Sequence, residues 1–275
     1  TPGSVNSLSK KERDISVGEI FLSTMSPVVN QEFEIGVVVK NIGREPIVQS
    51  TVRFFRYANN DPQPGELIAE MILSTLLPSD SQTIVRPISI SSQGVQRIFI
   101  SVETPRDDDS LNNGRDFSFV VGVQPHSIII NEIMYAPVGD MPEWVEFYNA
   151  STSAVNVGGW KISDTNTKSQ STLAGTQSII QPGAYFLATT DSSLHNYFAL
   201  SVPMFVEPFS ALNNTTPDAV VLFDNRNVVM DSVWYTPAWG GANGKSLERI
   251  DYDFSSNDSL NWKNSSPTPG IENND

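Results

Sequence analysis

The stretch of residues 128–160 constrains the fold of this chain more than any other. Residues 127–135 are rich in β-branched and apolar side chains, which predicts a buried strand. A turn rich in Pro, Gly and Asp follows at 137–142, and residues 143–149 then alternate between two faces. A period of two is what a strand lying on a core requires. The Gly-Gly-Trp at 158–160 permits a tight bend, so the stretch predicts two strands of an all-β domain.

A series of short motifs continues this pattern to the end of the chain. In order they read N-E-I, E-W-V-E-F-Y-N, V-G-G-W-K-I-S-D, Q-P-G-A-Y-F-L-A, A-V-V-L-F-D-N, V-M-D-S-V-W-Y, K-S-L-E-R, N-W and S-P-T-P-G. In these motifs and their spacing, residues of about 126–275 resemble a lamin-tail domain. The resemblance implies an immunoglobulin-like β-sandwich. It implies little about function, which lies in sites and not in folds.

The preceding residues predict a second domain of the same class. About seven short strands separated by turns are typical of a Greek-key sandwich. The expected strands are D-I-S-V-G-E-I-F-L-S, F-E-I-G-V-V-V-K-N-I-G and S-T-V-R-F-F-R-Y, followed by 67–73, 82–90, 96–102 and 116–123. The leading D-I-x-V, the V-V-V-K-N-I-G and an Asp/Asn-rich turn before the last strand resemble a CARDB-type adhesion-related domain.

The chain is therefore predicted to be all-β, with two tandem immunoglobulin-like Greek-key β-sandwiches. The expected boundaries are a linker at 1–13, the CARDB-like domain at 14–124 and the lamin-tail domain at 125–275. The six letters T-P-G-x-x-N occur at residues 1–6 and again at 268–273. We interpret residues 1–6 as the end of a preceding lamin-tail domain, so that the parent protein is a longer tandem array. A chance match of these letters is the alternative.

The composition excludes several classes of function. The chain has no Cys, which excludes disulfides, thiolate metal sites and cysteine nucleophiles. Its net charge of −14 repels nucleic acid phosphates, so no nucleic-acid partner is expected. No stretch approaches the roughly 18 apolar residues that a membrane-spanning helix needs. An acidic composition is also what calcium-binding surfaces show, although it more often reflects solubility.

The densest acidic cluster lies in the turn at 104–116, T-P-R-D-D-D-S-L-N-N-G-R-D. Its oxygen-bearing side chains are candidate calcium ligands, and calcium is the one cofactor that the sequence suggests. The alternative is a solvated hairpin loop, where Asp, Asn and Gly dominate because they suit turn geometry. The spacing is not that of an EF-hand. The candidate ligands are Asp107, Asp108, Asp109, Asn112 and Asn113.

Aromatic side chains are the remaining lead. Four tryptophans fall inside predicted strands or at their ends and are expected in the core, namely Trp144, Trp160, Trp234 and Trp262. Trp239 lies in the glycine-rich loop Y-T-P-A-W-G-G-A-N-G-K and is a candidate binding residue, because a loop tryptophan stacks on sugars, peptides or lipid headgroups. It can equally fold down and cap the sandwich.

No catalytic residues are predicted. His126 and His195, the two histidines, lie outside recognisable nucleophile motifs. Glu132 and Glu146 are expected on neighbouring strands, where we interpret Glu146 as an anchor for backbone amides or an Arg and not as half of a glycosidase dyad.

The sequence thus favours a non-catalytic binding or scaffolding segment of an exported, multidomain bacterial-type protein. The resemblance implies a secreted or cell-surface location and a role in attachment or domain presentation, with protein or carbohydrate partners at the cell envelope. The alternative is an accessory substrate-binding module of a secreted hydrolase whose catalytic domain lies elsewhere in the parent protein.

Overall fold

The computed structural model describes residues 10–58, 63–173, 175 and 177–274. The chain divides into two compact units, Thr1–Gly122 and Val123–Asp275. The sequence placed this boundary two residues later, between residues 124 and 125. The first nine residues of the predicted linker, and with them the first T-P-G-x-x-N segment, lie outside the described residues.

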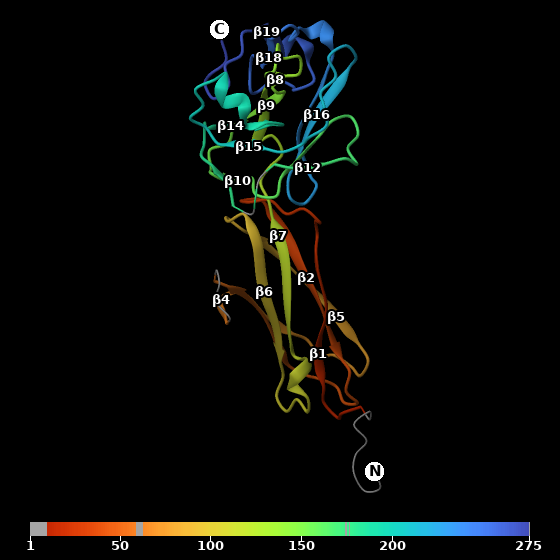
Figure 1. Cartoon of the computed structure of the whole chain (residues 1–275). Coiled ribbons are helices and arrows are strands. Elements are labelled where there is room, and N and C mark those ends of the chain that lie inside the picture. The colour runs from red at the N-terminus through yellow and green to blue at the C-terminus, as the bar shows by residue number, and fades with distance from the viewer. Residues whose placement is uncertain (1–9, 59–62, 174, 176, 275) are drawn as a thin grey trace, which may run out of the picture. The chain divides into compact units, whose positions relative to one another are not determined.

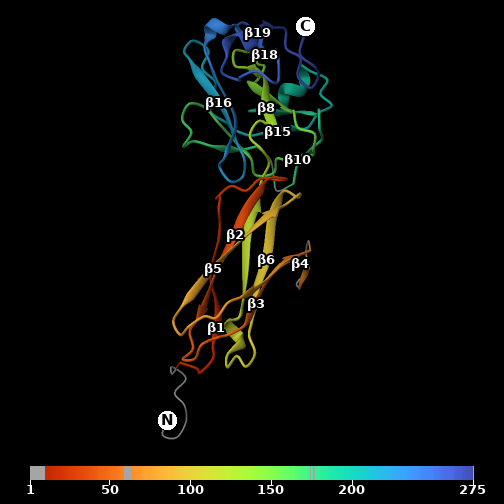
Figure 2. The same cartoon turned by 180° about the vertical axis from the view of Figure 1, so that it is seen from behind.

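The first unit is a sandwich of two antiparallel sheets, and its strands are the seven that the sequence predicted. β6 and β7 lie side by side in both views (Figure 1, Figure 2). One sheet has the order β1 (Ile15–Leu22), β2 (Glu32–Asn41), β5 (Ser81–Ser89). The other has the order β4 (Pro64–Leu73), β3 (Ser50–Tyr57), β6 (Gly94–Glu103), β7 (Gly114–Val121).

Alternation along the strands builds the core of this unit. In β2, Ile35, Val37 and Val39 point inward and are fully buried, as are Val52 and Phe54 in β3. These side chains come from opposite sheets and belong to one cluster. Burying each of them contributes about 1.5–3 kcal/mol relative to leaving it exposed, so this cluster holds the two sheets together.

The second unit is built on a six-stranded and a four-stranded sheet, with a separate two-stranded ribbon. The six-stranded sheet has the order β15 (Met204–Val206), β14 (Tyr185–Thr189), β9 (Trp144–Asn149), β8 (Ile128–Met134), β18 (Ser246–Arg249), β19 (Trp262–Ser265). The four-stranded sheet has the order β12 (Ser171–Thr172), β11 (Lys161–Ser163), β16 (Asp218–Phe223), β17 (Val229–Tyr235), and the ribbon pairs β10 (Val155–Asn156) with β13 (Ile179–Ile180).

The helical segments within the described residues are short 3-10 helices. They are η1 (Ser110–Asn112), η2 (Ser192–Asn196), η3 (Pro237–Trp239) and η4 (Ser259–Asn261). The Asp191 side chain caps η2 by accepting a hydrogen bond from the Ser193 amide at 2.7 Å. Across the described part of the chain, no helix combines the length and apolar character needed to cross a membrane.

Strands β8 and β9 are buried on both faces. Every residue of β8 is buried, which confirms the predicted buried strand. In β9 the predicted alternation of buried and exposed side chains does not occur, because Trp144 and Glu146 are buried as well as Val145 and Phe147. The second face is covered because residues 268–274, called here the C-terminal cap, bind across β9, β8 and β18. The C-terminus accordingly lies at the same end of this unit as β18 and β19 in both views (Figure 1, Figure 2).

One asparagine ends a central strand in each unit and makes the same set of hydrogen bonds. Each Nδ2 donates to the carbonyl four residues further on and to the carbonyl of a distant segment, and each Oδ1 accepts from the amide two residues further on. The carbonyl acceptors, at 2.9–3.0 Å, are Glu45 and Leu76 for Asn41, and Ser153 and Ile180 for Asn149. Because buried backbone groups must be paired, each asparagine fixes the turn after its strand.

Candidate functional site

The acidic turn of the first unit satisfies most of its carboxylates from within the protein. Asp107 accepts from the Asp109 amide at 3.1 Å and from Asn113 Nδ2 at 2.7 Å. Asp109 caps η1 by accepting from the Leu111 amide at 3.2 Å. Asp108 accepts from the Arg13 amide at 2.9 Å. These bonds are those of a turn held by Asp side chains, which was the alternative to the metal site.

Asp14, which the sequence analysis did not single out, faces the same turn. It is buried at the start of β1, and its Oδ1 accepts from Asn112 Nδ2 at 2.8 Å. Burial raises the pKa of Asp14, with further contributions from the charges of Asp107 and Asp109 and an opposing one from the bond to Asn112. Within the described ranges, no three His, Cys, Asp or Glu side chains are arranged to hold a metal ion. The calcium site therefore stays a prediction.

Calorimetry tests this calcium site. If the site exists, millimolar calcium raises the melting temperature and a chelator reverses the change, because a ligand that binds only the folded state stabilises it. Asp107→Asn would remove the increase, whereas Asp140→Asn, at an exposed position of the second unit, would retain it. A melting temperature that does not respond to calcium would reject the site.

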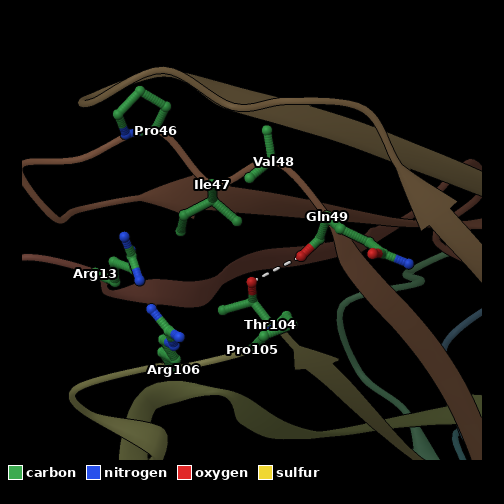
Figure 3. A pocket seen from close by; sticks show the side chains of 8 residues that line it. All are labelled: Arg13, Pro46, Ile47, Val48, Gln49, Thr104, Pro105 and Arg106. Carbon is green, nitrogen blue, oxygen red and sulfur yellow. Dashed lines mark hydrogen bonds between the residues drawn. The ribbon is translucent and has the colours of Figure 1, made fainter.

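A pocket of about 480 Å³ lies beside this turn, between residues 46–49 and 104–106 (Figure 3). The Thr104 hydroxyl donates to the Gln49 carbonyl at 2.7 Å and ties its two sides together. Arg13 and Arg106 both line it, and Arg13 is paired with Glu45 at 2.8 Å. Guanidinium groups suit an anionic ligand, but the ion pair with Glu45 already compensates one of them.

The second unit contains a cluster of three buried glutamates, called here the glutamate row. Glu146 on β9 pairs in register with Glu132 on β8, and Glu132 pairs with Glu248 on β18. Residues paired across neighbouring strands point to the same face, so the three side chains lie in one line across the sheet. The sequence predicted that Glu132 and Glu146 lie on neighbouring strands. Glu248 was missed, because the pairing of β18 with β8 is not visible in the sequence.

The C-terminal cap supplies the hydrogen-bond donors for this row. The Thr268 amide donates to Glu132 at 3.1 Å, and the Thr268 hydroxyl donates to Glu248 at 2.9 Å. The Gly270 amide donates to Glu146, which also accepts from Asn131 Nδ2 at 2.8 Å. The Asn274 amide donates to Glu248 at 3.1 Å. Glu146 therefore anchors a backbone amide, as predicted, and the row is sealed by the chain itself.

Burial dominates the electrostatics of the row. It raises the pKa of Glu146 to about 8, against the opposing effect of the bonds from Gly270 and Asn131. Burial also raises the pKa of Glu132 well above its ordinary value, and the neighbouring carboxylates add to this increase. Removing a carboxylate from water disfavours its charged form, and so does a second carboxylate beside it. Glu132 and Glu146 are thus carboxyls that hold protons tightly.

Three of the four tryptophans that were predicted to lie in the core are buried, and the fourth is exposed. Trp144, Trp160 and Trp262 are buried as expected, but Trp234 is 53% exposed, so its assignment to the core was wrong. β17 turns the other face inward, with Asp231, Val233 and Tyr235 buried. Trp239 is partly buried in η3, which lies against β19. Its role in binding stays a prediction.

An exposed apolar surface lies near Trp234. Ile250, Phe254 and Leu260 line a hollow of about 250 Å³, and Phe254 and Leu260 are 64% and 84% exposed. The loop between Phe254 and Leu260 contacts β17, since Asn257 accepts a hydrogen bond from the Trp234 amide at 2.8 Å. An apolar hollow lined by an exposed aromatic side chain such as Phe254 is typical of surfaces that bind partners.

Both units have the architecture of immunoglobulin-like β-sandwiches, a class of modules that present surfaces and loops. The Lamin Tail Domain family matches residues 123–237. This match confirms the lamin-tail resemblance, and the second unit therefore contains a lamin tail domain, an immunoglobulin-like module. None of the curated proteins compared with the chain matches it.

Solved structures with similarity to the chain include two of a CARDB domain from Pyrococcus furiosus, which cover the N-terminal part. The crystal structure, in complex with di-metal ions, is 23% identical with a TM-score of 0.37 and covers 42% of this chain and 99% of that chain. The solution structure is 23% identical with a TM-score of 0.34 and covers 40% and 96%. A β-glucosidase from Erythrobacter marinus is 13% identical with a TM-score of 0.31 and covers 40% of this chain and 15% of that chain.

Proposed function

We propose that this chain is a non-catalytic binding and scaffolding segment of an exported, multidomain bacterial-type protein. It attaches that protein at the cell envelope or presents a neighbouring domain there, and its partner is a protein of the envelope. The observation that carries this proposal is the exposed apolar surface of the second unit, where Trp234 lies near the hollow lined by Ile250, Phe254 and Leu260. Aromatic anchors of this kind dominate the energetics of protein interfaces.

The surface does not serve the stability of the unit. Exposed side chains of this size gain little by folding, since burial is what makes an apolar side chain stabilising. The polar groups beneath the surface are already satisfied, because Asn257 pairs with the β17 backbone through both the Trp234 amide and the Ser232 carbonyl. A partner that covers these side chains therefore gains their burial without breaking an existing contact.

Co-sedimentation with cell envelopes of the source organism tests the proposal. The chain is expected to sediment with intact envelopes and to lose this binding after the envelope proteins are digested. Trp234→Ser combined with Phe254→Ser should weaken binding at least about tenfold, the effect of losing one strong interface anchor. Val95→Ser, at a 68% exposed position of the first unit, is the matched control and should bind as the original chain does.

Two outcomes would contradict this proposal. Equal binding by the Trp234/Phe254 variant would show that the surface is not the binding site. Undiminished binding to protein-free envelope polysaccharide would instead favour an accessory substrate-binding module of a secreted hydrolase.

A further inference from the structure

The repeated segment T-P-G-x-x-N has a structural explanation in its second copy. Residues 268–271 form a tight turn, in which the Ile271 amide donates to the Thr268 carbonyl at 3.2 Å. Pro269 occupies the second position of this turn, and Gly270 occupies the third with a φ of 86°. This is the arrangement of a type II turn, which favours Pro at the second position and needs Gly or Asn at the third. The letters T-P-G thus specify the turn.

The repeated positions are also those that the glutamate row and its neighbours hold. Thr268 donates to Glu132 and Glu248, Gly270 donates to Glu146, and Asn273 Nδ2 donates to the Arg249 carbonyl at 2.8 Å. The two positions that differ between the copies are the exposed ones. Ile271 is 61% exposed, and Glu272 is exposed as well.

Residues 1–6 therefore contain the counterparts of Thr268, Gly270 and Asn273, while Ser7 stands where Asn274 donates to Glu248. Thr1 matches Thr268, Gly3 matches Gly270 and Asn6 matches Asn273. Ser4 and Val5 stand at the two exposed positions, where the side chain is free to vary. The differences between the two copies thus fall at the two positions that face solvent.

We propose that the glutamate row is a binding site for T-P-G-x-x-N segments, and that residues 1–6 of a second copy of this chain occupy it in place of residues 268–273. The exchange links two copies through the N-terminal segment of one and the lamin tail domain of the other. This proposal does not depend on the proposed function, because it concerns the sealed face of the sheet and not the exposed surface near Trp234.

The chain's own cap competes with such an exchange. A tethered segment has an effective concentration of about millimolar, so the cap covers the row in most molecules. A free segment binds only the molecules in which the cap is displaced, and its apparent Kd is the intrinsic Kd divided by the fraction of such molecules. Gly270→Val weakens the cap selectively. A β-branched residue is strained at a φ of 86°, and a Cβ there would lie 3.2 Å from Val202 Cγ2. The row itself is unchanged by this substitution.

Fluorescence anisotropy with a labelled peptide tests the site. The peptide carries residues 1–10 with an acetylated N-terminus, so that Thr1 offers an amide N–H as Thr268 does. The receptor is the full chain with Gly3→Val and Gly270→Val, which removes competition from both segments. The peptide should bind this receptor at least about tenfold more tightly than it binds the unaltered chain.

Two altered peptides and one altered receptor give the specificity. A Gly3→Val peptide should lose binding, because it cannot form the turn, whereas a Val5→Ala peptide should bind as the original does. Adding Glu146→Ala to the receptor should weaken binding at least about fivefold, since it removes the acceptor of the turn-glycine amide. Sedimentation equilibrium then tests the exchange between copies. The Gly270→Val chain should dimerise with rising concentration, and the Gly3→Val/Gly270→Val chain should stay monomeric.

The proposal is overturned if the folded receptor binds the peptide no more tightly than the unaltered chain does. Equal binding of the Gly3→Val peptide, or of the receptor with Glu146→Ala, would also overturn it, because binding would then lie elsewhere. Should Gly270→Val fail to fold, Asn273→Ala opens the cap without backbone strain and decides the question by the same criteria.

Discussion

Replacing Asp231 with Ala is expected to lower the free energy of unfolding of the second unit by about 3–5 kcal/mol. Asp231 lies on β17 and is fully enclosed, with Arg249 of β18 at 2.9 Å. Its Oδ2 also accepts from the Ile130 amide at 2.8 Å, and Arg249 Nε donates to the Ile130 carbonyl at 2.7 Å. Removing the carboxylate leaves a buried guanidinium uncompensated and the Ile130 amide without its acceptor.

The size of this effect follows from where the pair lies. β18 ends at Arg249, so beyond that residue β8 has no neighbour on this side to complete its ladder. The side chains of Asp231 and Arg249 take over the backbone groups of Ile130, and they join β17 of the four-stranded sheet to β8 of the six-stranded one. Burial alone lowers the pKa of Arg249, and the charge of Asp231 opposes this. The carboxylate therefore holds the cation in place.

Denaturant unfolding measures this prediction. Asp140→Ala, at an exposed position of the same unit, is the control and should change stability little. A double-mutant cycle with Arg249→Met should show a coupling energy, because the residues share one network. A cost for Asp231→Ala no larger than that for Asp140→Ala would contradict the prediction.

The second large effect is a fall in stability of the second unit as the pH rises from about 5 to 8. The pKa of Glu146 is about 8 in the folded protein against an ordinary value of 4.5. Between these values the folded state binds more protons than the unfolded state, so its stability is greatest below the ordinary pKa and is lost as the pH passes through the raised one. One pKa unit corresponds to about 1.4 kcal/mol, which makes the total on the order of a few kcal/mol.

Calorimetry at pH 5, 6.5 and 8 measures this dependence. The transition of the second unit should shift to lower temperature at each step. Glu146→Gln cannot ionise and should flatten the dependence, whereas Glu34→Gln, at an exposed position of β2, should not. A transition that moves to higher temperature between pH 5 and 8 would show that the row is held ionised, with the bonds from the cap outweighing its burial.

The sequence predicted the strands well because most of them are specified locally. Alternation in β2 and the apolar run of β8 each identify a strand without reference to its neighbours. The residue types that favour turns predicted where the strands end. Asn41 and Asn149 show why, because each accepts a hydrogen bond from the amide two residues further on, so the signal lies within a few residues.

The inward face of β17 could not be predicted in this way. Its alternate residues form two sets, one with Met230 and Trp234 and the other with Asp231 and Val233. The first set looks apolar, yet Trp234 is exposed and only Met230 of that set is buried, whereas the second set, which continues to Tyr235, is buried throughout from Asp231. The buried Asp231 is stable here because it forms an ion pair with Arg249. The seven residues of β17 contain no signal that predicts this partner.

The glutamate row, too, could not be predicted from a local pattern. A local pattern indicated that Glu146 is structural, but its register with Glu132 and Glu248 joins three strands that are far apart in the sequence. The recurrence of T-P-G-x-x-N indicated the end of a domain and not a site for glutamates. Its meaning became clear only from the donors of Thr268 and Gly270.

The position of the C-terminal cap has a consequence for biosynthesis. Domains fold as units while the chain leaves the ribosome, N-terminal parts first. The first unit has all of its strands once β7 has emerged, so it is free to fold early. The lamin tail domain must wait for Asn274, because until then its glutamates face water and the central sheet has one open side. Until residues 268–274 have emerged, this nascent domain therefore exposes groups that the folded domain buries, which makes it prone to aggregation.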